Sequence, residues 1–379
     1  MKRLIVCFFL LIFLCSGCTK SDDKTVLKFS SWGSQSEIEI LKPIIADFEA
    51  QNADVKIEFM HIPQNYFQKI HLLLASNLAP DVIFINNLNL PVYQNYLMDL
   101  TDYADKNIFF EQTLQSLSTN GKILAIPRDA SNLVIYYNKD LFKKYGIKEP
   151  TTTWTFEDLL DLGLKFKKHN VFAISFEEEP LFYLPYLMSS GGGILSDDLK
   201  TEIINTPQSQ SGLNFYADLR NKYNFAPKKS QSASTTMAQM FLQQKLAMHL
   251  SGRWLVPKYR EAADFDWDII NFPNGDSGSV VPMDASGWAI FKDTKNKDLA
   301  IKFVQYLSSK ENIEKMTKSG LITPARIDVA NSECFLKGKP QSSKIFLDVI
   351  KTSKPTPVSK DYRELTDDLS RKIEPVFNN

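Results

Sequence analysis

The strongest constraint on the fold is an alternation of short apolar runs and amphipathic segments near the start of the chain. Runs with the length and apolar content of strands lie at residues 26–29, 55–59 and 82–85. Between them, residues 37–52 and 65–76 repeat apolar side chains at helical spacing. Strands that are almost continuously apolar are typical of a parallel sheet covered on both faces. This order predicts an α/β domain.

A second set of strands and helices follows. Apolar runs at residues 133–137, 171–176 and 246–250 predict strands, and residues 155–168 and 207–223 predict helices. The polar segment 128–132 is expected to separate two strands. Because 379 residues are too many for one ordinary core, we expect two α/β units.

The first residues have the pattern of an export signal. Two cations precede a short apolar run, residues 4–14, which is too short for a stable membrane span. The run ends in the sequence CSGC, which resembles the bacterial lipobox except that a cysteine stands where leucine is usual. We expect residues 1–17 to be a lipoprotein signal peptide, Cys18 to be lipidated and residues 18–25 to be a tether. The alternative is an ordinary signal peptide with an incidental cysteine.

Charge and cysteine content narrow the class of protein further. Lys+Arg and Asp+Glu both number 44, so the chain lacks the basic surplus that phosphate binding normally needs, and we expect no nucleic-acid partner. After signal cleavage and lipidation, Cys334 would be the remaining free thiol. An exported domain without a disulfide must then rely on the size of its core.

A cation and a large aromatic side chain directly follow the strand predicted at residues 246–250. Ser251 and Gly252 end this strand, and Arg253 and Trp254 come next. In open α/β sheets, ligands bind in the crevice outside the carboxyl ends of the strands. The pair is therefore a candidate ligand platform, with a core tryptophan and a solvated arginine as the alternative.

Polar side chains also follow the first and third predicted strands of the N-terminal unit. These side chains are Trp32, Ser34, Gln35, Asn86, Asn87 and Asn89. Strand ends of one parallel sheet meet along a common edge, so we expect these residues to line one crevice. Each polar residue is also a common turn former.

No constellation of catalytic or metal-binding residues stands out. The four histidines form no HExxH pair, and no Cys/His spacing suits zinc, so we expect no metal and no cofactor. The GDSGS sequence at residues 275–279 mimics a serine-protease motif, but the α/β pattern favours a turn. Residues 177–179 are three adjacent glutamates, which cannot face each other across a cleft as a glycosidase pair does. We expect a protein that is not an enzyme.

Taken together, these segments resemble the family 1 extracellular solute-binding proteins, the sugar-binding lipoproteins of ABC importers that are related to maltose-binding protein. The resemblance runs from residue 26 to the C-terminus and rests on nine short motifs in the family's order. They are SWG (31–33), APDVIF (79–84), GKILAIP (121–127), YYNKDLF (136–142), TWTFEDLL (153–160), SSGGGIL (189–195), AMHLSGRW (247–254), SGWAI (286–290) and TPAR (323–326).

The resemblance implies a two-lobed periplasmic-binding-protein fold of class α/β, in which each lobe is a mostly parallel sheet flanked by helices. Three chain crossings would join the lobes, near residues 129–132, 281–284 and 324–328. The first lobe would then hold residues 26–130 and 285–323, and the second would hold residues 131–284 and 324–379. Such lobes close on a ligand by hinge bending.

The resemblance also implies which residues contact the ligand. In the family, the tryptophan of the SGRW segment packs against a sugar ring, and sugars need both aromatic faces and polar partners for their hydroxyls. The implied ligand-binding residues are Trp254, Arg253, Trp32, Ser34, Gln35, Asn86, Asn89, Asp129, Asn132, Tyr183, Asp284, Trp288 and Arg326. Arg326 is equally compatible with an interlobe salt bridge, and Arg253 with a brace for its loop.

The implied function is that of a substrate-binding subunit of an ABC importer, anchored to the cell envelope. The expected partners are a mono- or oligosaccharide, the permease transmembrane subunits and a membrane held through the lipid anchor, with the protein itself a monomer. Asp284-Ala285 departs from a Gly-Gly pair often found in the family, and a carboxylate there would disfavour a phosphate. Rival hypotheses are the same fold binding glycerol-3-phosphate or a glycerophosphodiester, a glycan-acting cleft enzyme, and a sensor or adhesin.

Overall fold

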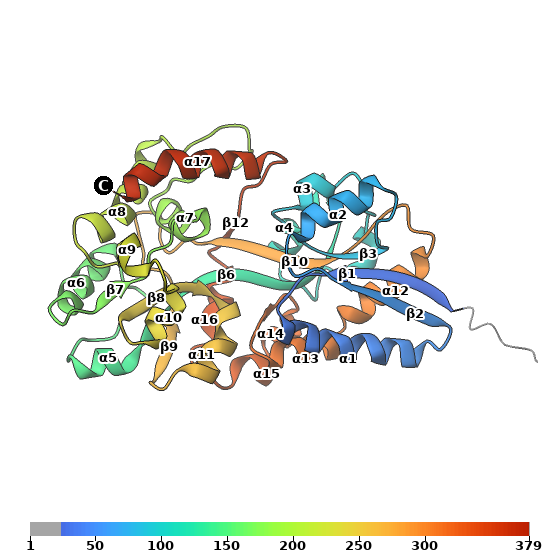
Figure 1. Cartoon of the computed structure of the whole chain (residues 1–379), viewed down its shortest axis with the longest axis horizontal. Coiled ribbons are helices and arrows are strands. Elements are labelled where there is room, and N and C mark those ends of the chain that lie inside the picture. Colours follow the sequence, from blue (N-terminus) through green and yellow to red (C-terminus); the bar gives the residue numbers. More distant parts are fainter. Residues whose placement is uncertain (1–23, 379) are drawn as a thin grey trace, which may run out of the picture.

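The structure, a computed structural model, describes residues 24–378 and shows two lobes side by side (Figure 1). The predicted signal peptide and Cys18 lie outside the described residues. The elements up to the first crossing are β1 (Thr25–Ser31), α1 (Gln35–Gln51), β2 (Val55–His61), α2 (Tyr66–Ala75), β3 (Val82–Asn86), α3 (Leu90–Tyr93), η1 (Thr101–Tyr103), α4 (Glu111–Ser116), β4 (Ser118–Thr119), β5 (Lys122–Ile123) and β6 (Ile126–Asn138).

The middle of the chain builds most of the second lobe. Its elements are α5 (Lys139–Lys144), α6 (Phe156–Lys167), β7 (Phe172–Ile174), α7 (Pro180–Ser189), α8 (Pro207–Asn221), α9 (Lys229–Ser232), α10 (Met237–Leu242), β8 (Leu246–Gly252), η2 (Arg253–Leu255), α11 (Val256–Ala262) and β9 (Trp267–Ile270). The chain then returns through β10 (Pro282–Ile290), α12 (Lys297–Leu307), α13 (Lys310–Lys318) and β11 (Thr323–Pro324). It ends with α14 (Ile327–Ala330), α15 (Glu333–Leu336), α16 (Lys344–Ile350), β12 (Lys354–Pro355) and α17 (Tyr362–Phe377).

The N-terminal strands form the parallel sheet that the sequence predicts. β1 pairs in parallel with β2 on one side and with β3 on the other. The order across the described strands continues as β2-β1-β3-β10-β6-β8-β7. Helix α1 starts at a serine cap, since the Ser34 hydroxyl accepts from the Glu37 backbone N–H at 3.3 Å.

Two long antiparallel strands, β6 and β10, connect the lobes (Figure 1). We expected residues 128–132 to be a loop between two strands, but β6 is one continuous strand of 13 residues. The reason is pairing: β10 runs along the first half of β6, β11 joins at Asp129 and Ala130, and β8 and β9 flank the second half. These neighbours satisfy backbone groups that the sequence pattern would leave to solvent.

Buried apolar side chains fall into three clusters. One contains residues between Leu133 and Met283 together with side chains of α15, α16 and α17. The other two contain residues of β1–β3, α1 and α2 together with side chains of α12 and α13. The chain therefore contributes to the two ends of the molecule alternately, and the lobe boundaries given above stay a prediction.

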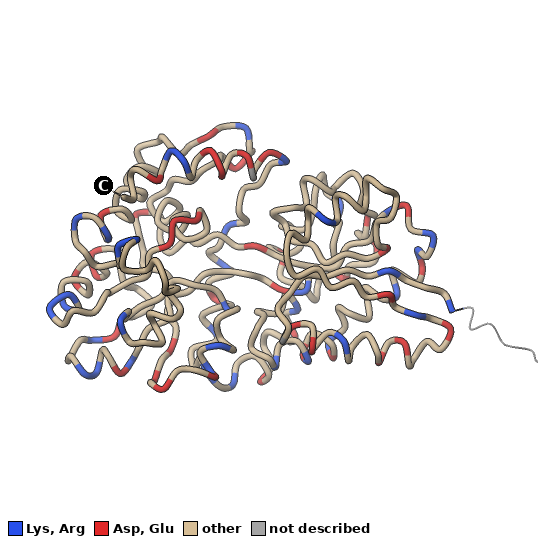
Figure 2. The backbone as a smooth tube through the Cα atoms, viewed as in Figure 1, with Lys and Arg blue, Asp and Glu red and all other residues tan. Residues whose placement is uncertain are grey.

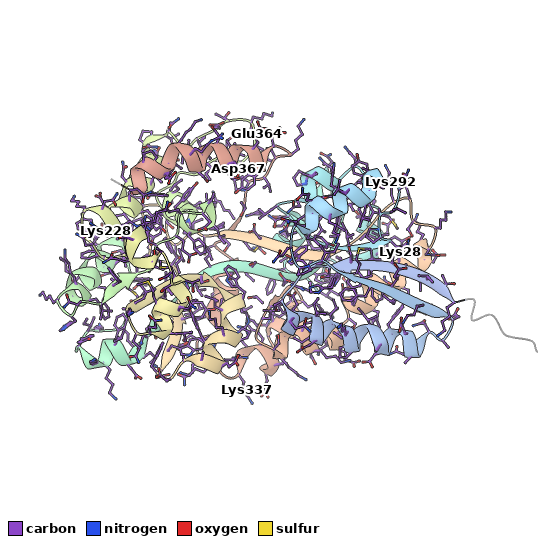
Figure 3. The ribbon with its side chains drawn as sticks, in the orientation of Figure 1. Lys28, Lys228, Lys292, Lys337, Glu364 and Asp367 are labelled. Atoms are coloured by element: carbon purple, nitrogen blue, oxygen red, sulfur yellow. The ribbon has the colours of Figure 1, made fainter. Side chains whose placement is uncertain are left out.

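The surface carries both signs of charge. Lysines and arginines are interspersed with acidic residues over both lobes (Figure 2). Lys28 and Lys292 lie on the first lobe, Lys228 lies on the second, and Glu364 and Asp367 project from α17 (Figure 3). Within residues 24–378, no helix has the length and apolarity needed to cross a bilayer.

Candidate functional site

A pocket of about 160 Å³ lies where the lobes meet beside β6, and we call it the interlobe pocket. Its lining comes from both lobes and from the crossing strands: Trp32, Glu37, Phe84, Arg128, Asp129, Ala130, Ser131, Arg253, Trp254, Ser286, Leu321, Ile322 and Thr323. Of the predicted site residues, the structure brings together Trp32, Asp129, Arg253 and Trp254.

Trp32 enters the pocket from the first lobe, directly after β1. Aromatic rings hold its indole in place: the centroid of Tyr66 lies 4.9 Å away, that of Phe67 5.3 Å and that of Phe84 4.2 Å. Because Trp32 remains partly exposed, this packed ring still offers surface to a ligand. The aromatic cluster gives the first lobe a rigid apolar wall.

Trp254 enters from the second lobe, in the short helix η2 that follows β8. Its side chain is 37% exposed, an unusual exposure for tryptophan in a structure with a large core. The ring lies against Gly252, where a Cβ would come within 1.8 Å of the ring carbon Cζ3. Glycine at this position therefore lets the ring lie flat against the end of β8, with its other side open.

Arg253 is only 4% exposed, although it is among the residues that line the interlobe pocket. Its guanidinium carbon lies 4.1 Å from the centre of the Phe335 ring and 5.2 Å from that of Phe346. Its Nε and Nη1 atoms are buried and have no hydrogen-bond partner among the described residues. Burial lowers the pKa of this arginine to about 10. The cation–π stack favours the bracing role, and ligand contact by Arg253 stays a prediction.

A cluster of charges forms the floor of the interlobe pocket. Arg128 donates from Nη1 to Glu37 Oε1 at 2.6 Å, and from Nε to Asp129 Oδ2. Burial raises the pKa of Asp129, and the neighbouring guanidinium opposes this rise. Glu37 and Arg128 were not among the residues predicted for the site.

A second pocket of about 540 Å³ adjoins the first, and we call it the side pocket. Trp254 lines both pockets, so the two share a wall. The remaining lining of the side pocket includes Glu177, Phe182, Thr235, Ser251 and Lys258. An apolar ring with several polar groups around it is a common composition for a small-molecule site.

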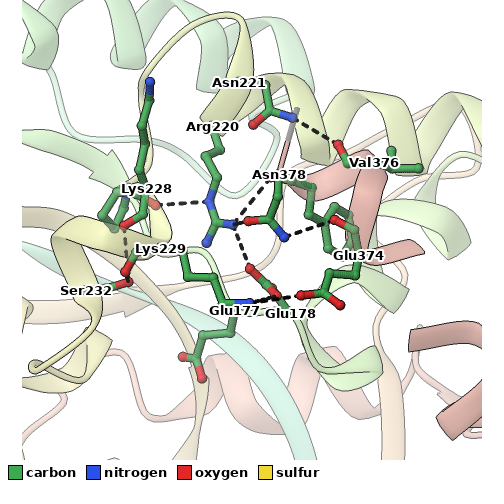
Figure 4. A network of polar contacts seen from close by, with 12 residues as sticks. Glu177, Glu178, Arg220, Asn221, Lys228, Lys229, Ser232, Glu374, Val376 and Asn378 are labelled. Atoms are coloured by element: carbon green, nitrogen blue, oxygen red, sulfur yellow. Dashed lines mark hydrogen bonds and ion pairs between the residues drawn. The ribbon is translucent and has the colours of Figure 1, made fainter. Parts of the chain in front are cut away.

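The glutamates at residues 177–179 form one edge of the side pocket. Glu178 is partly buried and accepts from Arg220 Nη1 at 2.8 Å, and the Arg220 guanidinium carbon lies 3.8 Å from the centre of the Phe176 ring (Figure 4). Lys229 lies 3.5 Å from Glu178 and 3.2 Å from Glu374 at the end of α17. Glu177 points away from this network in the same view. The network fixes the loop and leaves Glu177 free to face the pocket.

His249 lies beneath Glu177, on β8. Its Nδ1 is 2.5 Å from the Tyr259 hydroxyl, and its Nε2 is 3.5 Å from Glu177 Oε1. Burial lowers the pKa of His249, so the neutral imidazole is favoured. His249 is therefore a neutral polar neighbour of Glu177 and not a charged partner of its carboxylate.

Three predicted site residues lie inside the core and not in either pocket. Trp288 is fully buried between Phe29 and Phe84, since its position on β10 faces the helices of the first lobe. Tyr183 is also fully buried, 5.7 Å from the Phe377 ring. Asn132 is 2% exposed and donates to the Phe346 carbonyl at 2.8 Å. The structure buries these three side chains, and their direct contact with a ligand stays a prediction.

Four others serve the turns that follow strands. Ser34 caps α1, and the Gln35 amide donates to Glu39 at 3.2 Å on the exposed side of that helix. Asn86 accepts from the backbone and the side chain of Asn89 at 3.2 and 2.8 Å. None of the four lines the interlobe pocket.

The last two predicted residues brace the crossings. Asp284 accepts from Asn87 Nδ2 at 3.1 Å, and burial raises its pKa. Arg326 donates from Nε and Nη2 to the Asp328 carboxylate at 3.0 and 2.8 Å, and from Nη1 to the Ser308 carbonyl at 3.2 Å. Arg326 is therefore held by a local pair and not by an interlobe salt bridge.

A third cavity, of about 630 Å³, lies at the opposite edge of the crossing strands, beside β12, and we call it the opposite groove. Residues of both lobes line it, including Asn87, Gln115, Met188 and Lys354. No aromatic side chain is among its lining residues in the described part of the chain. The opposite groove therefore lacks a stacking surface, which the two smaller pockets have.

Several residues of the two pockets escaped sequence reasoning. Glu37 has the pattern of an ordinary first-turn helix residue, and Arg128 that of a loop cation after Pro127. One sequence feature did point to Arg128: it directly precedes the predicted first crossing, residues 129–132. Residues 24–378 contain no group of acidic, histidine or cysteine side chains arranged to hold a metal ion.

Comparison with known proteins gives a consistent result. A family model described as bacterial extracellular solute-binding protein matches residues 32–314. The multiple sugar-binding protein of Streptococcus mutans is 26% identical over 329 residues, which cover 80% of this chain and 77% of that protein. The maltodextrin-binding protein of Bacillus subtilis is 27% identical over 367 residues, covering 89% and 81%. An ABC substrate-binding protein of Listeria monocytogenes, solved in complex with cycloalternan, has a TM-score of 0.85 at 25% identity, covering 94% of each chain.

Proposed function

The chain belongs to the bacterial extracellular solute-binding proteins, and from that premise we propose that it is the substrate-binding subunit of an ABC importer that captures a neutral oligosaccharide between its lobes. One observation carries this proposal. Trp32 from the first lobe and Trp254 from the second line the same pocket at the crossing strands. Closing the lobes would bring the two rings onto opposite sides of one ligand.

The chemistry of the interlobe pocket suits a sugar. The CH faces of a pyranose are apolar and stack on aromatic rings, each stack adding about 0.5–1.5 kcal/mol beyond area burial. Hydroxyl groups need acceptors, and Glu37 and Asp129 supply carboxylate oxygens beside the rings. Hydrogen bonds to charged groups contribute about 1.5–3 kcal/mol each.

Two adjoining pockets favour an oligosaccharide over a single sugar. The interlobe pocket and the side pocket share Trp254, so a chain of sugars could run across this ring from one to the other. The side pocket is the larger, at about 540 Å³. The names of the two relatives, which concern maltodextrin and multiple sugars, and the cycloalternan complex support the same substrate class.

The charges of the pocket count against the phosphate-bearing rivals. Arg128 is occupied by two carboxylates, and the unpaired nitrogens of Arg253 are closed off by packing. A phosphate would therefore meet two carboxylates there, beside an arginine that is already paired with both of them. The family consists of transport receptors that bind solutes and do not act as enzymes.

Membrane attachment and partners complete the proposal. The protein is exported, and Cys18 is proposed to carry the lipid that holds it to the envelope. The closed, loaded protein would work as a monomer and deliver its ligand to permease transmembrane subunits.

The test is a thermal-shift screen of the purified protein against maltotriose, raffinose, glucose, glycerol-3-phosphate and glycerophosphocholine. A ligand at about 100 times its Kd should stabilise the fold by about 2.7 kcal/mol. We expect the largest shift with an oligosaccharide. A shift with glycerophosphocholine alone, and none with any sugar, would refute the proposal.

A further inference from the structure

The charged cluster at the floor of the interlobe pocket is more than a structural ion pair. Arg128, Glu37 and Asp129 have side chains that are only 10%, 16% and 8% exposed. All three nevertheless line the pocket, beside both tryptophans. Burying such charges is costly, so an arrangement of this kind in a binding cleft calls for a functional reason.

Each carboxylate uses one oxygen to bind Arg128. Glu37 does so with Oε1 and Asp129 with Oδ2. No hydrogen bond from another described residue reaches Glu37 Oε2 or Asp129 Oδ1, and neither atom is among the fully buried ones. Two carboxylate oxygens are therefore left as acceptors, held apart by one guanidinium.

The same arginine also supports the stacking wall. Its guanidinium carbon lies 4.0 Å from the centre of the Phe84 ring, and Phe84 lies 4.2 Å from Trp32. Cation–π contacts of this kind hold a ring in one orientation. Arg128 thus connects the two kinds of surface a sugar needs, an aromatic face and hydroxyl acceptors.

We propose that Arg128 is a positioning residue that fixes Glu37 and Asp129 as a pair of acceptors for two hydroxyls of one sugar ring. This end of the cleft then selects an uncharged ring and rejects one that carries a carboxylate or phosphate. The inference rests on the proposed function and deepens it, because it names residues that set substrate charge. Glu37 joins the site as a specificity residue.

The proposal has a pH signature, since the Arg128 guanidinium opposes the rise that burial causes in the pKa of Asp129. Burial already raises the pKa of Asp129, and removing the cation would raise it further. Besides Arg128, the charged or titratable groups around Asp129 are Glu37 on α1, Arg253 on η2 and His61 on β2. The Nε2 atom of His61 is 3.0 Å from the Gly33 carbonyl oxygen. β10 and β11 contribute Ser286 and Thr323, which do not titrate in this range.

The experiment is calorimetric titration of wild type and Arg128→Met with the oligosaccharide of the panel that gives the largest thermal shift, between about pH 5 and 8. Methionine is an unbranched apolar side chain that carries no charge. Wild-type affinity should vary less with pH than that of the variant, because Arg128 opposes the rise in the pKa of Asp129. In Arg128→Met the affinity should fall as the pH falls, by up to about tenfold per unit below the raised pKa.

Rescue and control variants separate positioning from general damage. Adding Asp129→Asn to Arg128→Met removes one of the two carboxylates, so the pH profile should become flat again. Glu37→Gln, which leaves the Arg128–Asp129 pair intact, should weaken binding at least about tenfold, and it should also lower thermal stability because it breaks the Arg128–Glu37 ion pair. Arg326→Met is the matched control, because Arg326 pairs with a carboxylate, that of Asp328, outside the interlobe pocket. This variant should leave the pH profile of sugar affinity unchanged.

Two results would overturn the proposal. One is that Arg128→Met binds the sugar as tightly as wild type does and that its affinity does not change with pH. The other is wild-type affinity in both Glu37→Gln and Asp129→Asn. If wild type binds no sugar of the panel, the proposed function fails and this inference fails with it, whereas sugar binding with unchanged variants refutes the inference alone.

Discussion

Replacing Trp254 by alanine should remove most of the stacking surface of the second lobe. A tryptophan side chain carries about 150–250 Å² of surface that contacts can bury. With 37% of it exposed, about 55–90 Å² is available to a ligand, worth about 1.4–2.3 kcal/mol at 25 cal/mol per Å². Adding about 0.5–1.5 kcal/mol for stacking gives a total of about 2–4 kcal/mol. At about 1.4 kcal/mol per factor of ten, the Kd should rise about 30- to 500-fold.

The assay is calorimetric titration with the best oligosaccharide, alongside chemical unfolding of the free protein. The buried part of the ring also packs on the lobe, so the variant should lose about 2–4 kcal/mol of folding free energy. That loss is smaller than the total stability typical of domains, about 5–15 kcal/mol, and the free protein should stay folded. Tyr103→Ala is a matched control, because Tyr103 is 39% exposed and lies outside both pockets.

Two outcomes would contradict this reasoning. If Trp254→Ala binds sugar as tightly as Tyr103→Ala does, the exposed ring is not a stacking surface. If the free variant unfolds outright, Trp254 is a core residue whose exposure has no functional meaning.

Three further predictions address the neighbourhood of the site. Gly252→Ala should displace the Trp254 ring and weaken sugar binding in a titration, while melting shows a folded protein, because the added Cβ meets only the far end of a side chain. Arg220→Met should lower the free energy of unfolding by about 2–4 kcal/mol in urea, since it leaves Glu178 without its buried cation. Hydrogen bonds from Arg326 hold the pKa of Asp328 below its usual value, so this pair stabilises at neutral pH and the gain disappears as the pH falls below about 4. Arg326→Met should therefore destabilise the protein more near pH 7 than at about pH 3, as urea unfolding at both pH values can show.

Much of the fold follows from patterns that depend on neighbouring residues alone. The parallel β1–β3 sheet came from apolar runs and helical spacing, and β8 was predicted almost to its end. The crossing strand β6 was not, because its middle carries Arg128, Asp129, Ser131 and Asn132. Such residues form a strand only when partners from distant parts of the chain pair on both sides, and short windows of sequence contain no information about these partners.

Prediction of the site from sequence has the same limit as prediction of β6. A tryptophan after a buried strand was a sound candidate at position 254, and the structure leaves that ring exposed. Trp288 had similar motif support but faces the core, since its side of β10 is decided by register with β3. Arg128 and Glu37 are 91 positions apart in the chain, so their contact could not be read from spacing. Propensity and periodicity locate elements, whereas the site depends on which faces meet.

The most direct test of the account is a crystal structure of the protein with the oligosaccharide that gives the largest thermal shift. The account predicts sugar rings in the interlobe and side pockets, with one ring stacked against Trp254 and another part of the sugar facing Trp32. Hydroxyl groups of the sugar should donate hydrogen bonds to Glu37 and Asp129. An oligosaccharide seated instead in the opposite groove beside β12, or on the outer surface of either lobe, would contradict it.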